Sequence, residues 1–357
     1  MIPRLCRPVQ SILLLAVLTA LVVPWAGASA CTRVLFSGTN GTVITARSMD
    51  WTEDIGTNLY ILPRGIARTG EAGPNSIRWR AKYGSVVATG YDISTTDGVN
   101  EKGLATNLNW LAESEFPAFG PDSKPGLTVA AWAQYVLDNF ATVAEAVAAL
   151  EQEPFTPVTD TVPGQDRPAS VHLAISDATG DSAIIEYLGG KQIIHHGRQY
   201  KVMTNSPSYD QQLALNAYWQ EIGGTVMLPG TSRAADRFAR AAFYVDAIPQ
   251  GGPPDRLLAS MFGVIRNASV PLGISTPDRP EISSTRWRSV VDHRRLLYFF
   301  DSAISPNVFW VDLKKIDFSA ETGHVRRLGL GDEQSHPYAG DATDDFVAAE
   351  PFKFMGL

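Results

Sequence analysis

The spacing of apolar and polar residues predicts a strand-rich start, a helical middle and a strand-rich end. Two short apolar runs flank Asn40-Gly41, a dipeptide that favours a two-residue hairpin turn because both turn positions need positive φ. A second turn signal, Asn100-Glu101-Lys102-Gly103, precedes residues 105–110, which have the pattern of a buried strand. Between these signals, residues 60–98 hold short apolar pieces broken by proline and glycine, which predict strands and loops without a helix.

The register of the first hairpin decides which side chains approach Cys31. If Asn40-Gly41 is the whole turn, Cys31 lies opposite Asp50 across the hairpin. In that register Arg47 points to the other face of the sheet, unless a bulge re-aims it. The pattern therefore predicts that Asp50 returns to Cys31 and leaves the placement of Arg47 open.

Apolar residues at helical spacing occupy the middle of the chain, as in the stripe formed by Val129, Trp132 and Val136. The predicted helices span residues 128–140, 143–150, 209–222, 232–248 and 257–264. The predicted later strands span residues 171–176, 183–188, 192–195, 200–204, 287–291, 295–300 and 308–313. Hairpins, central helices and hairpins again indicate one layered domain with antiparallel sheets over residues 31–357.

Residues 1–30 have the three parts of a secretory signal peptide. Arg4 and Arg7 supply the basic start, residues 12–23 the apolar run, and Ala28-Ser29-Ala30 the small residues of a cleavage site. No later segment approaches the ~20 apolar residues needed to span a bilayer. We therefore expect an exported protein, periplasmic or secreted, without stable membrane insertion.

The charge balance argues against a nucleic-acid partner. The chain carries a formal net charge of −7, and removal of residues 1–30 leaves 28 basic and 37 acidic residues. Binding to a phosphate backbone needs a basic surface, which this composition does not offer. A small-molecule substrate is the more suitable partner.

The cysteines point to nucleophilic chemistry. Of the two, Cys6 lies in the expected signal peptide, so the exported chain keeps Cys31 alone and forms no internal disulfide. Cleavage before Cys31 would place a thiol and a free α-amino group on one residue, a nucleophile beside its own base. The alternative is lipid attachment to this cysteine in an exported binding or scaffold lipoprotein, although Ala28 stands where such signals usually carry leucine.

Other chemistries find little support in the sequence. The six histidines show no metal-ligand spacing, and the chain has no Gly-x-Ser-x-Gly elbow, phosphate-binding loop or dinucleotide fingerprint. A cysteine–histidine protease stays open in principle, because any histidine could approach Cys31 in space. We expect neither a metal nor an organic cofactor.

Four motifs in order resemble the choloylglycine hydrolase family of N-terminal-nucleophile hydrolases, whose members are bile salt hydrolases and penicillin V acylases. They are Cys31-Thr32-Arg33, Ala46-Arg47-Ser48-Met49-Asp50, Asn100-Glu101-Lys102-Gly103-Leu104 and Met203-Thr204-Asn205-Ser206-Pro207. The resemblance extends to about residue 313. It implies an α+β fold, a four-layer αββα sandwich, and commonly a homotetramer.

The resemblance also implies roles for individual residues. Cys31 would be the nucleophile and its free amine the base, Arg47 would flank the thiol, and Asp50 would orient the amine. Asn205 would be one side chain of the oxyanion hole. Asn109 would be the other, in the context Leu108-Asn109-Trp110.

Two of these assignments have rivals nearby in the sequence. Asn107 competes with Asn109 because the segment after the Asn-Glu-Lys-Gly turn is one residue shorter than the family pattern. The remaining active-site arginine of the family opens a helix, and Arg237 in Asp236-Arg237-Phe238 fits better than Arg233.

The expected reaction is hydrolysis of a linear amide through a thioester acyl-enzyme. Trp51, Trp110 and Trp287 are the candidates for an apolar or aromatic acyl pocket, whereas Trp132 fits better as a core residue on a helix stripe. The candidate substrates are penicillin V, N-acyl homoserine lactones and conjugated bile salts. The exported form favours the first two over bile salts.

Overall fold

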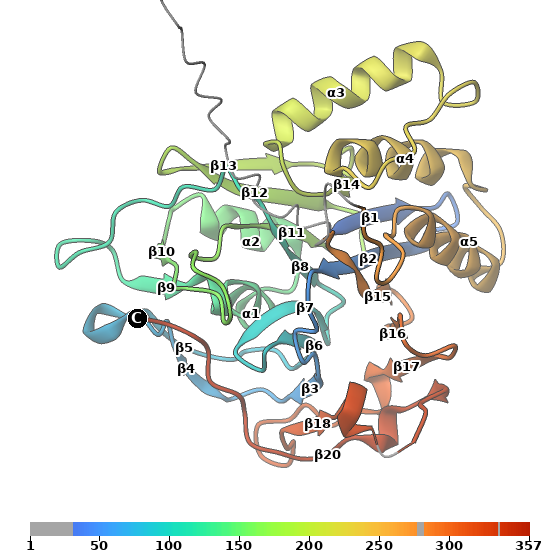
Figure 1. The fold of residues 1–357 in the computed structure, drawn as a ribbon. Coiled ribbons are helices and arrows are strands. Elements are labelled where there is room, and N and C mark those ends of the chain that lie inside the picture. The colour runs from blue at the N-terminus through green and yellow to red at the C-terminus, as the bar shows by residue number, and fades with distance from the viewer. Residues whose placement is uncertain (1–30, 277–281, 335) are drawn as a thin grey trace, which may run out of the picture.

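The computed structural model describes residues 31–276, 282–334 and 336–357. The predicted signal peptide, residues 1–30, lies outside the described residues. Two large sheets, face to face, form the centre of the molecule (Figure 1).

The first sheet has seven strands. Its spatial order is β14 (Val202–Met203), β1 (Thr32–Ser37), β2 (Val43–Trp51), β15 (Ser284–Asp292), β16 (Leu297–Ser302), β17 (Val308–Asp312) and β19 (Gly340–Asp341). All of its neighbouring pairs are antiparallel except β17 with β19. Every residue of β2 is buried, because this strand lies near the middle of the sheet and is covered on both faces.

The second sheet has nine strands. Its order is β13 (Lys191–His196), β12 (Ser182–Leu188), β11 (Val171–Ser176), β8 (Ala105–Trp110), β7 (Ser94–Asn100), β6 (Ser85–Gly90), β3 (Leu59–Leu62), β18 (Arg326–Leu328) and β20 (Val347–Ala348). Two small pairs complete the strands: β4 (Ala67–Thr69) with β5 (Arg78–Arg80), and β9 (Gly126–Thr128) with β10 (Thr156–Val158).

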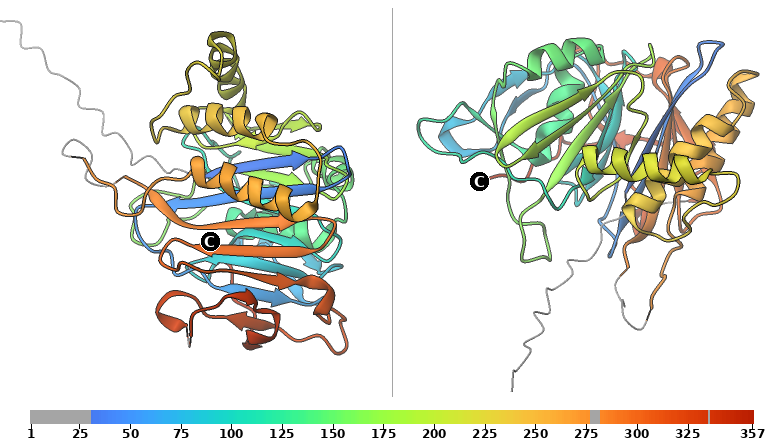
Figure 2. Two further views of the ribbon diagram at one scale, coloured as in Figure 1. Left: turned by 90° about the vertical axis from the view of Figure 1, so that its right-hand side faces the viewer. Right: turned by 90° about the horizontal axis from the view of Figure 1, so that it is seen from above.

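Helices cover the outer face of each sheet. α1 (Val129–Asn139) and α2 (Val143–Leu150) pack on the nine-stranded sheet, while α4 (Ala234–Ala247) and α5 (Pro254–Asn267) pack on β1, β2 and β15. α3 (Tyr209–Ile222) contacts α4 and projects from the body. Figure 2 shows the resulting order of layers, helix, sheet, sheet, helix. The expected α+β class and αββα sandwich are confirmed.

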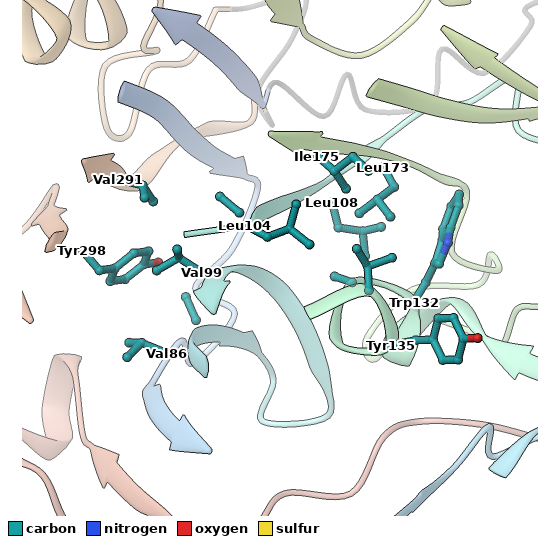
Figure 3. Close-up of a cluster of buried hydrophobic side chains, with 14 of the residues drawn as sticks. Val86, Val99, Leu104, Leu108, Trp132, Tyr135, Leu173, Ile175, Val291 and Tyr298 are labelled. Atoms are coloured by element: carbon teal, nitrogen blue, oxygen red, sulfur yellow. The ribbon is translucent and has the colours of Figure 1, made fainter. Parts of the chain in front are cut away.

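The main core lies between the sheets and beneath α1. Figure 3 shows Val291 and Tyr298 of the seven-stranded sheet beside Val99 of the other sheet, with Trp132 of α1 at the far side of the cluster. A second core fills the space between β1 and β2 and the helices α4 and α5. The strand β2 divides the two cores: its Met49 and Trp51 belong to the first, and its Ile44 and Ala46 to the second.

The first hairpin differs from the predicted register by one residue. Its loop is three residues long, Thr39-Asn40-Gly41, closed by a hydrogen bond from Gly38 N to Thr42 O (2.8 Å), and Gly41 takes the left-handed conformation with φ of 81°. This is the form in which a type I turn is followed by a glycine bulge. The ladder consequently pairs Arg33 with Arg47, and the expected pairing of Cys31 with Asp50 is wrong.

The predicted helices are all present. α2 and α3 have the predicted bounds, whereas α5 begins three residues earlier because Pro254 occupies its first turn, where a missing N–H costs nothing. β16 begins at Leu297, two residues later than predicted, since Leu296 has a left-handed φ of 59° and ends the preceding turn. The predicted strand over residues 200–204 shortens to Val202–Met203.

Candidate active site

Cys31 lies directly before β1, at one end of the seven-stranded sheet. It belongs to the core between the two sheets. Its side chain is buried, and Sγ lies 3.8 Å from both Met49 Sδ and the carbonyl oxygen of Asp50. The β1–β2 ladder explains the contact with Met49, because continuing the observed pairing brings these two residues opposite each other. The thiol thus enters the space between the sheets.

Arg47 approaches the thiol from the same face. Its Nη2 atom lies 3.8 Å from Cys31 Sγ and donates a hydrogen bond to the carbonyl oxygen of Leu108 (2.9 Å). The guanidinium stacks over the ring of Trp287, 4.8 Å from its centroid, and Nε lies 4.0 Å from Asp97 Oδ2. The side chains of Arg47 and Asp97 are both fully buried, so the guanidinium is fixed where its charge acts on the thiol.

Burial and charge act in opposite directions on the thiol. Burial raises the pKa of Cys31 above its ordinary value, because a thiolate loses its hydration there, while the positive charge of Arg47 lowers it. Arg237 lowers the pKa further, by a smaller amount. A nucleophilic thiolate at this position therefore depends on the two arginines.

Asp50 lies at the same end of the sheet but points toward the helical side. Its carboxylate accepts hydrogen bonds from Ser48 Oγ (3.2 Å) and Thr285 Oγ1 (2.5 Å). Burial raises the pKa of Asp50 to about 6, and Arg237 opposes this shift. The carboxylate is thus held in place by two hydroxyl groups, on a residue whose backbone carbonyl contacts Cys31 Sγ.

Arg237 joins Cys31 to the segment that contains Asn205. From the first turn of α4, its Nη1 donates to the carbonyl oxygen of Cys31 (2.6 Å), and its Nη2 donates to Asn205 Oδ1 (2.8 Å). Burial lowers the pKa of Arg237 to about 10, and the site stays cationic at neutral pH. Its rival Arg233 is the exposed residue before α4 and does not reach the site.

The two candidate asparagines of the oxyanion hole lie on neighbouring segments. Asn109 Nδ2 donates to the carbonyl oxygen of Thr204 (3.1 Å), and Asn205 Nδ2 donates to that of Trp110 (2.7 Å). The Oδ1 atom of Asn109 is buried without a hydrogen-bond partner among the described residues. Asn107 lies two residues back on the same strand face, where its Nδ2 donates to Asp97 Oδ2 (2.6 Å), away from this group.

The thiol opens into an apolar cavity of about 700 Å³, its open mouth included. Trp51 and Trp110 line this cavity with their ring centroids 5.6 Å apart. Trp287 lies elsewhere, because its ring covers Arg47 and its Nε1 donates to Thr57 Oγ1 (2.9 Å). Trp132 is a core residue against Tyr187. An acyl group with an aromatic or alkyl end fits such a wall.

The structure adds residues that the sequence analysis did not single out. His172 lies beneath the asparagines, with Nε2 donating to Thr204 O (3.0 Å) and Nδ1 3.1 Å from Glu186 Oε1. It belongs to none of the recognised motifs, and only its pairing with Asn109 across the β11–β8 ladder reveals its place. Arg167 stacks over Trp110 at 4.1 Å, from an irregular loop that shows no sequence pattern.

Comparison with known proteins agrees with this geometry. Residues 31–326 match the sequence model of the family described as linear amide C–N hydrolases, choloylglycine hydrolase family. The penicillin V acylase of Pectobacterium atrosepticum is 57% identical over 95% of this chain and 96% of that protein. A bile salt hydrolase/transferase of Clostridium perfringens is 24% identical over 80% of this chain and 93% of its own length.

Solved structures show the same relationship. The penicillin V acylase of Agrobacterium tumefaciens superposes with a TM-score of 0.85 at 62% identity, over 92% of this chain and 100% of that one. A variant of the conjugated bile acid hydrolase of Clostridium perfringens shares the fold, with a TM-score of 0.71 at 21% identity over 86% and 99%. The chain therefore belongs to the choloylglycine hydrolase family and is an amidohydrolase that acts on linear amides.

Proposed function

We propose that the protein hydrolyses N-acyl amides with Cys31 as the nucleophile and the α-amine of Cys31 as the base. The observation that carries the proposal is the position of the thiol. It is buried beside Arg47, faces the apolar cavity, and lies directly after the expected cleavage site. Removal of residues 1–30 would create the amine that the mechanism requires.

The first half of the reaction transfers the acyl group to the enzyme. The thiol proton passes to the α-amine, Sγ bonds to the substrate carbonyl carbon, and the carbonyl oxygen becomes an oxyanion. Asn109 and Asn205 each use one Nδ2 hydrogen for a backbone carbonyl, which leaves the second hydrogen for the oxyanion. When the C–N bond breaks, the ammonium of Cys31 protonates the leaving amine and a thioester remains.

The second half releases the acyl group. The α-amine takes a proton from water, and the resulting hydroxide attacks the thioester carbonyl. The C–S bond then breaks, the carboxylic acid leaves, and the ammonium returns its proton to the thiolate. An amine with an ordinary pKa of ~8 is suited to both proton transfers at neutral pH. Asp50 would orient the ammonium form, and Arg237 would hold the Cys31 carbonyl so that the amine stays over Sγ.

The preferred acyl group is proposed to be apolar or aromatic. The cavity presents Trp51 and Trp110 at the thiol and an almost entirely apolar wall beyond them. This lining supports phenoxyacetyl amides such as penicillin V, or N-acyl homoserine lactones, ahead of conjugated bile salts. The higher identity to a penicillin V acylase than to a bile salt hydrolase supports the same ranking.

Export and self-assembly are also proposed for this protein. We propose export to the periplasm or medium as one domain over residues 31–357, on the strength of the signal-like residues 1–30. Among the described residues, no helix has the length and apolar character to cross a membrane. A homotetramer is supported by α3, which leaves Leu215 and Tyr218 exposed on a helix that projects from the body.

The rival function is a lipoprotein with a lipid on Cys31. The burial of this thiol opposes it, because Sγ points between the sheets and a thioether-linked lipid would have to leave through the cavity. Intact mass of the exported protein separates the two: an unmodified chain from Cys31 supports the enzyme, and a lipid-modified N-terminus would end the proposal.

The activity itself is tested with a panel of N-acyl amides that includes penicillin V. We expect the wild-type protein to release amine and the Cys31→Ala variant to be inactive, with Cys31→Ser strongly impaired. A matched substitution at an exposed residue, Asp122→Asn, should leave turnover unchanged. Undiminished turnover in Cys31→Ala would contradict the proposed nucleophile.

A further inference from the structure

The last six residues, 352–357, form an irregular segment that we call the strap. In Figure 1 it runs from β20 to the C-terminus beside β4 and β5. Two backbone hydrogen bonds attach it, from Met355 N to the carbonyl oxygen of Ile93 and from Leu357 N to that of Glu71, both 2.9 Å. It thereby joins the turn after β6 to the loop between β4 and β5.

Two aromatic side chains that precede Met355 anchor the strap. Phe354 is buried beneath the guanidinium of Arg68, 5.3 Å from the ring centroid, and Phe352 packs edge-on against Tyr60 at 5.0 Å. Two aromatic contacts and two hydrogen bonds over six residues fix the position of the segment. Met355 is thus held in place although it lies in no helix or strand.

Gly356 shows how close the strap lies to the body. A Cβ atom at this position would stand 2.0 Å from the carbonyl oxygen of Glu71, which is backbone and has little room to yield. Glu71 itself has a left-handed φ of 49°, an uncommon conformation for a residue with a side chain. The two segments fit together only with glycine at 356.

Met355 forms part of the wall of the cavity that contains Cys31. The thiol enters from the ends of β1 and β2, whereas Met355 is attached to the β6–β7 turn at Ile93. Ser94, next to this turn, donates a hydrogen bond to the carbonyl oxygen of Ala130 at the start of α1 (3.2 Å). Both residues also line the cavity. Cys31 and Met355 therefore bound one cavity from different elements.

We propose that Met355 is a specificity-determining residue that limits the size of the acyl group. The proposal rests on the proposed amide hydrolysis at Cys31, because the acyl group bound to Sγ would extend into this cavity. The strap lies beyond residue 326, where the match to the family's sequence model ends. The size limit is therefore a property of this segment and is not carried by the family motifs.

The physical basis is the volume that the methionine side chain occupies. Acyl groups that fill the cavity must contact Met355, and its flexible thioether adapts to short groups but still occupies space that a long group needs. One methylene more or less in an apolar pocket changes discrimination by roughly 10-fold or more. Shortening this side chain should therefore favour longer acyl groups.

The experiment compares wild type with Met355→Ala, Met355→Leu and Met355→Phe. The substrates are straight-chain amides of one amine, from butanoyl to dodecanoyl, and kcat/KM is measured from amine release. Met355→Ala should shift the dodecanoyl-to-butanoyl ratio upward by at least roughly 10-fold. Met355→Phe should shift it downward, and Met355→Leu, with similar volume, should stay near wild type.

Two further variants separate the effect of Met355 on the cavity wall from unspecific effects of substitutions in the strap. Gly356→Ala should shift the ratio in the same direction as Met355→Ala, because the added Cβ forces the strap away from Glu71. Lys353→Ala, on the strap but exposed, should leave the ratio unchanged. The proposal would be overturned if Met355→Ala, with the melting temperature of wild type, changed kcat/KM by the same factor for every acyl group or left the dodecanoyl-to-butanoyl ratio unchanged.

Binding distinguishes failure of this proposal from failure of the proposed function. If the wild type releases no amine from any substrate, the catalytic proposal fails, yet the cavity can still be probed with free butanoate to dodecanoate. Quenching of tryptophan fluorescence reports their binding, since Trp51 and Trp110 line the cavity. Met355→Ala should again favour the longer carboxylates, and an unchanged preference would refute the size limit.

Discussion

Arg47 Nη2 lies 3.8 Å from Cys31 Sγ because Arg47 pairs with Arg33 across the β1–β2 ladder. Opposite residues of an antiparallel pair point to the same face, and residues two apart on a strand do so as well. Cys31, two residues before Arg33, consequently shares the face of Arg47. The three-residue loop Thr39-Asn40-Gly41 is thus what brings the guanidinium to the thiol.

Removal of this guanidinium should make the thiol less acidic. In Arg47→Gln, the pKa of Cys31 should rise, because burial then acts without the main opposing charge. We expect kcat/KM to fall on the order of 100-fold. The pH dependence of Cys31 alkylation measures the shift, and Arg78→Gln, an exposed arginine, is the control. An unchanged alkylation profile would show that Arg47 does not act on the thiol.

Asp97 should be coupled energetically to Arg47. Its carboxylate lies 4.0 Å from Arg47 Nε and accepts hydrogen bonds from Tyr298 Oη and Asn107 Nδ2, both 2.6 Å. Removing one partner of a buried ion pair typically costs about 3–5 kcal/mol, because the other charge is left uncompensated. Urea unfolding of Arg47→Gln, Asp97→Asn and the double variant should show a double loss smaller than the sum. Additive losses would mean that the two charges are independent.

Asp50 should make the unfolding free energy depend on pH. Its pKa is about 6 in the folded protein against an ordinary 3.8, so the folded state holds the proton more tightly. The stability from this proton is fully present below pH 3.8 and is lost as the pH rises through 6. Over that range wild type should lose roughly 3 kcal/mol relative to Asp50→Asn. Parallel stability curves for these two proteins would contradict the assignment, with Asp122→Asn as the control.

His172 should act as a positioning residue for the oxyanion hole. It shares the carbonyl oxygen of Thr204 with Asn109 Nδ2, and Thr204 directly precedes Asn205. His172→Ala should lower kcat by about 10-fold with little change in KM, because the asparagines lose their alignment without losing substrate contacts. Steady-state kinetics tests this, with the exposed His324→Ala as control. A change confined to KM would place His172 in substrate binding instead.

The family motifs in the sequence were sufficient for the layers of the fold, whereas the catalytic roles of the motif residues stay predictions. The stripe of Val129, Trp132 and Val136 in α1 has clear helical spacing, and Cys31, Asp50 and Asn205 stand in short motifs with a chemical reason for each position. The choice between Asn107 and Asn109 required the structure, because both lie on one face of β8. Only their partners, Asp97 for one and Thr204 for the other, distinguish them.

Other features had no local signal. Asn-Gly is compatible with loops of two or three residues, so the register of the first hairpin depends on how Gly38 and Thr42 close it. Trp287 is of a residue type suited to an acyl pocket, yet its position on the strand places its ring over Arg47. The strap at Met355 has no periodicity at all, since its conformation comes from contacts with distant loops.

The central claim, that Cys31 supplies both nucleophile and base, is tested most directly by adding one residue. We propose to compare the protein that begins at Cys31 with a form carrying a single alanine before it, each verified by intact mass. The added residue converts the amine into an amide, so hydrolysis of penicillin V should fall by at least roughly 100-fold. Folding, followed by thermal unfolding, should stay the same. Equal hydrolysis by both forms would contradict the account.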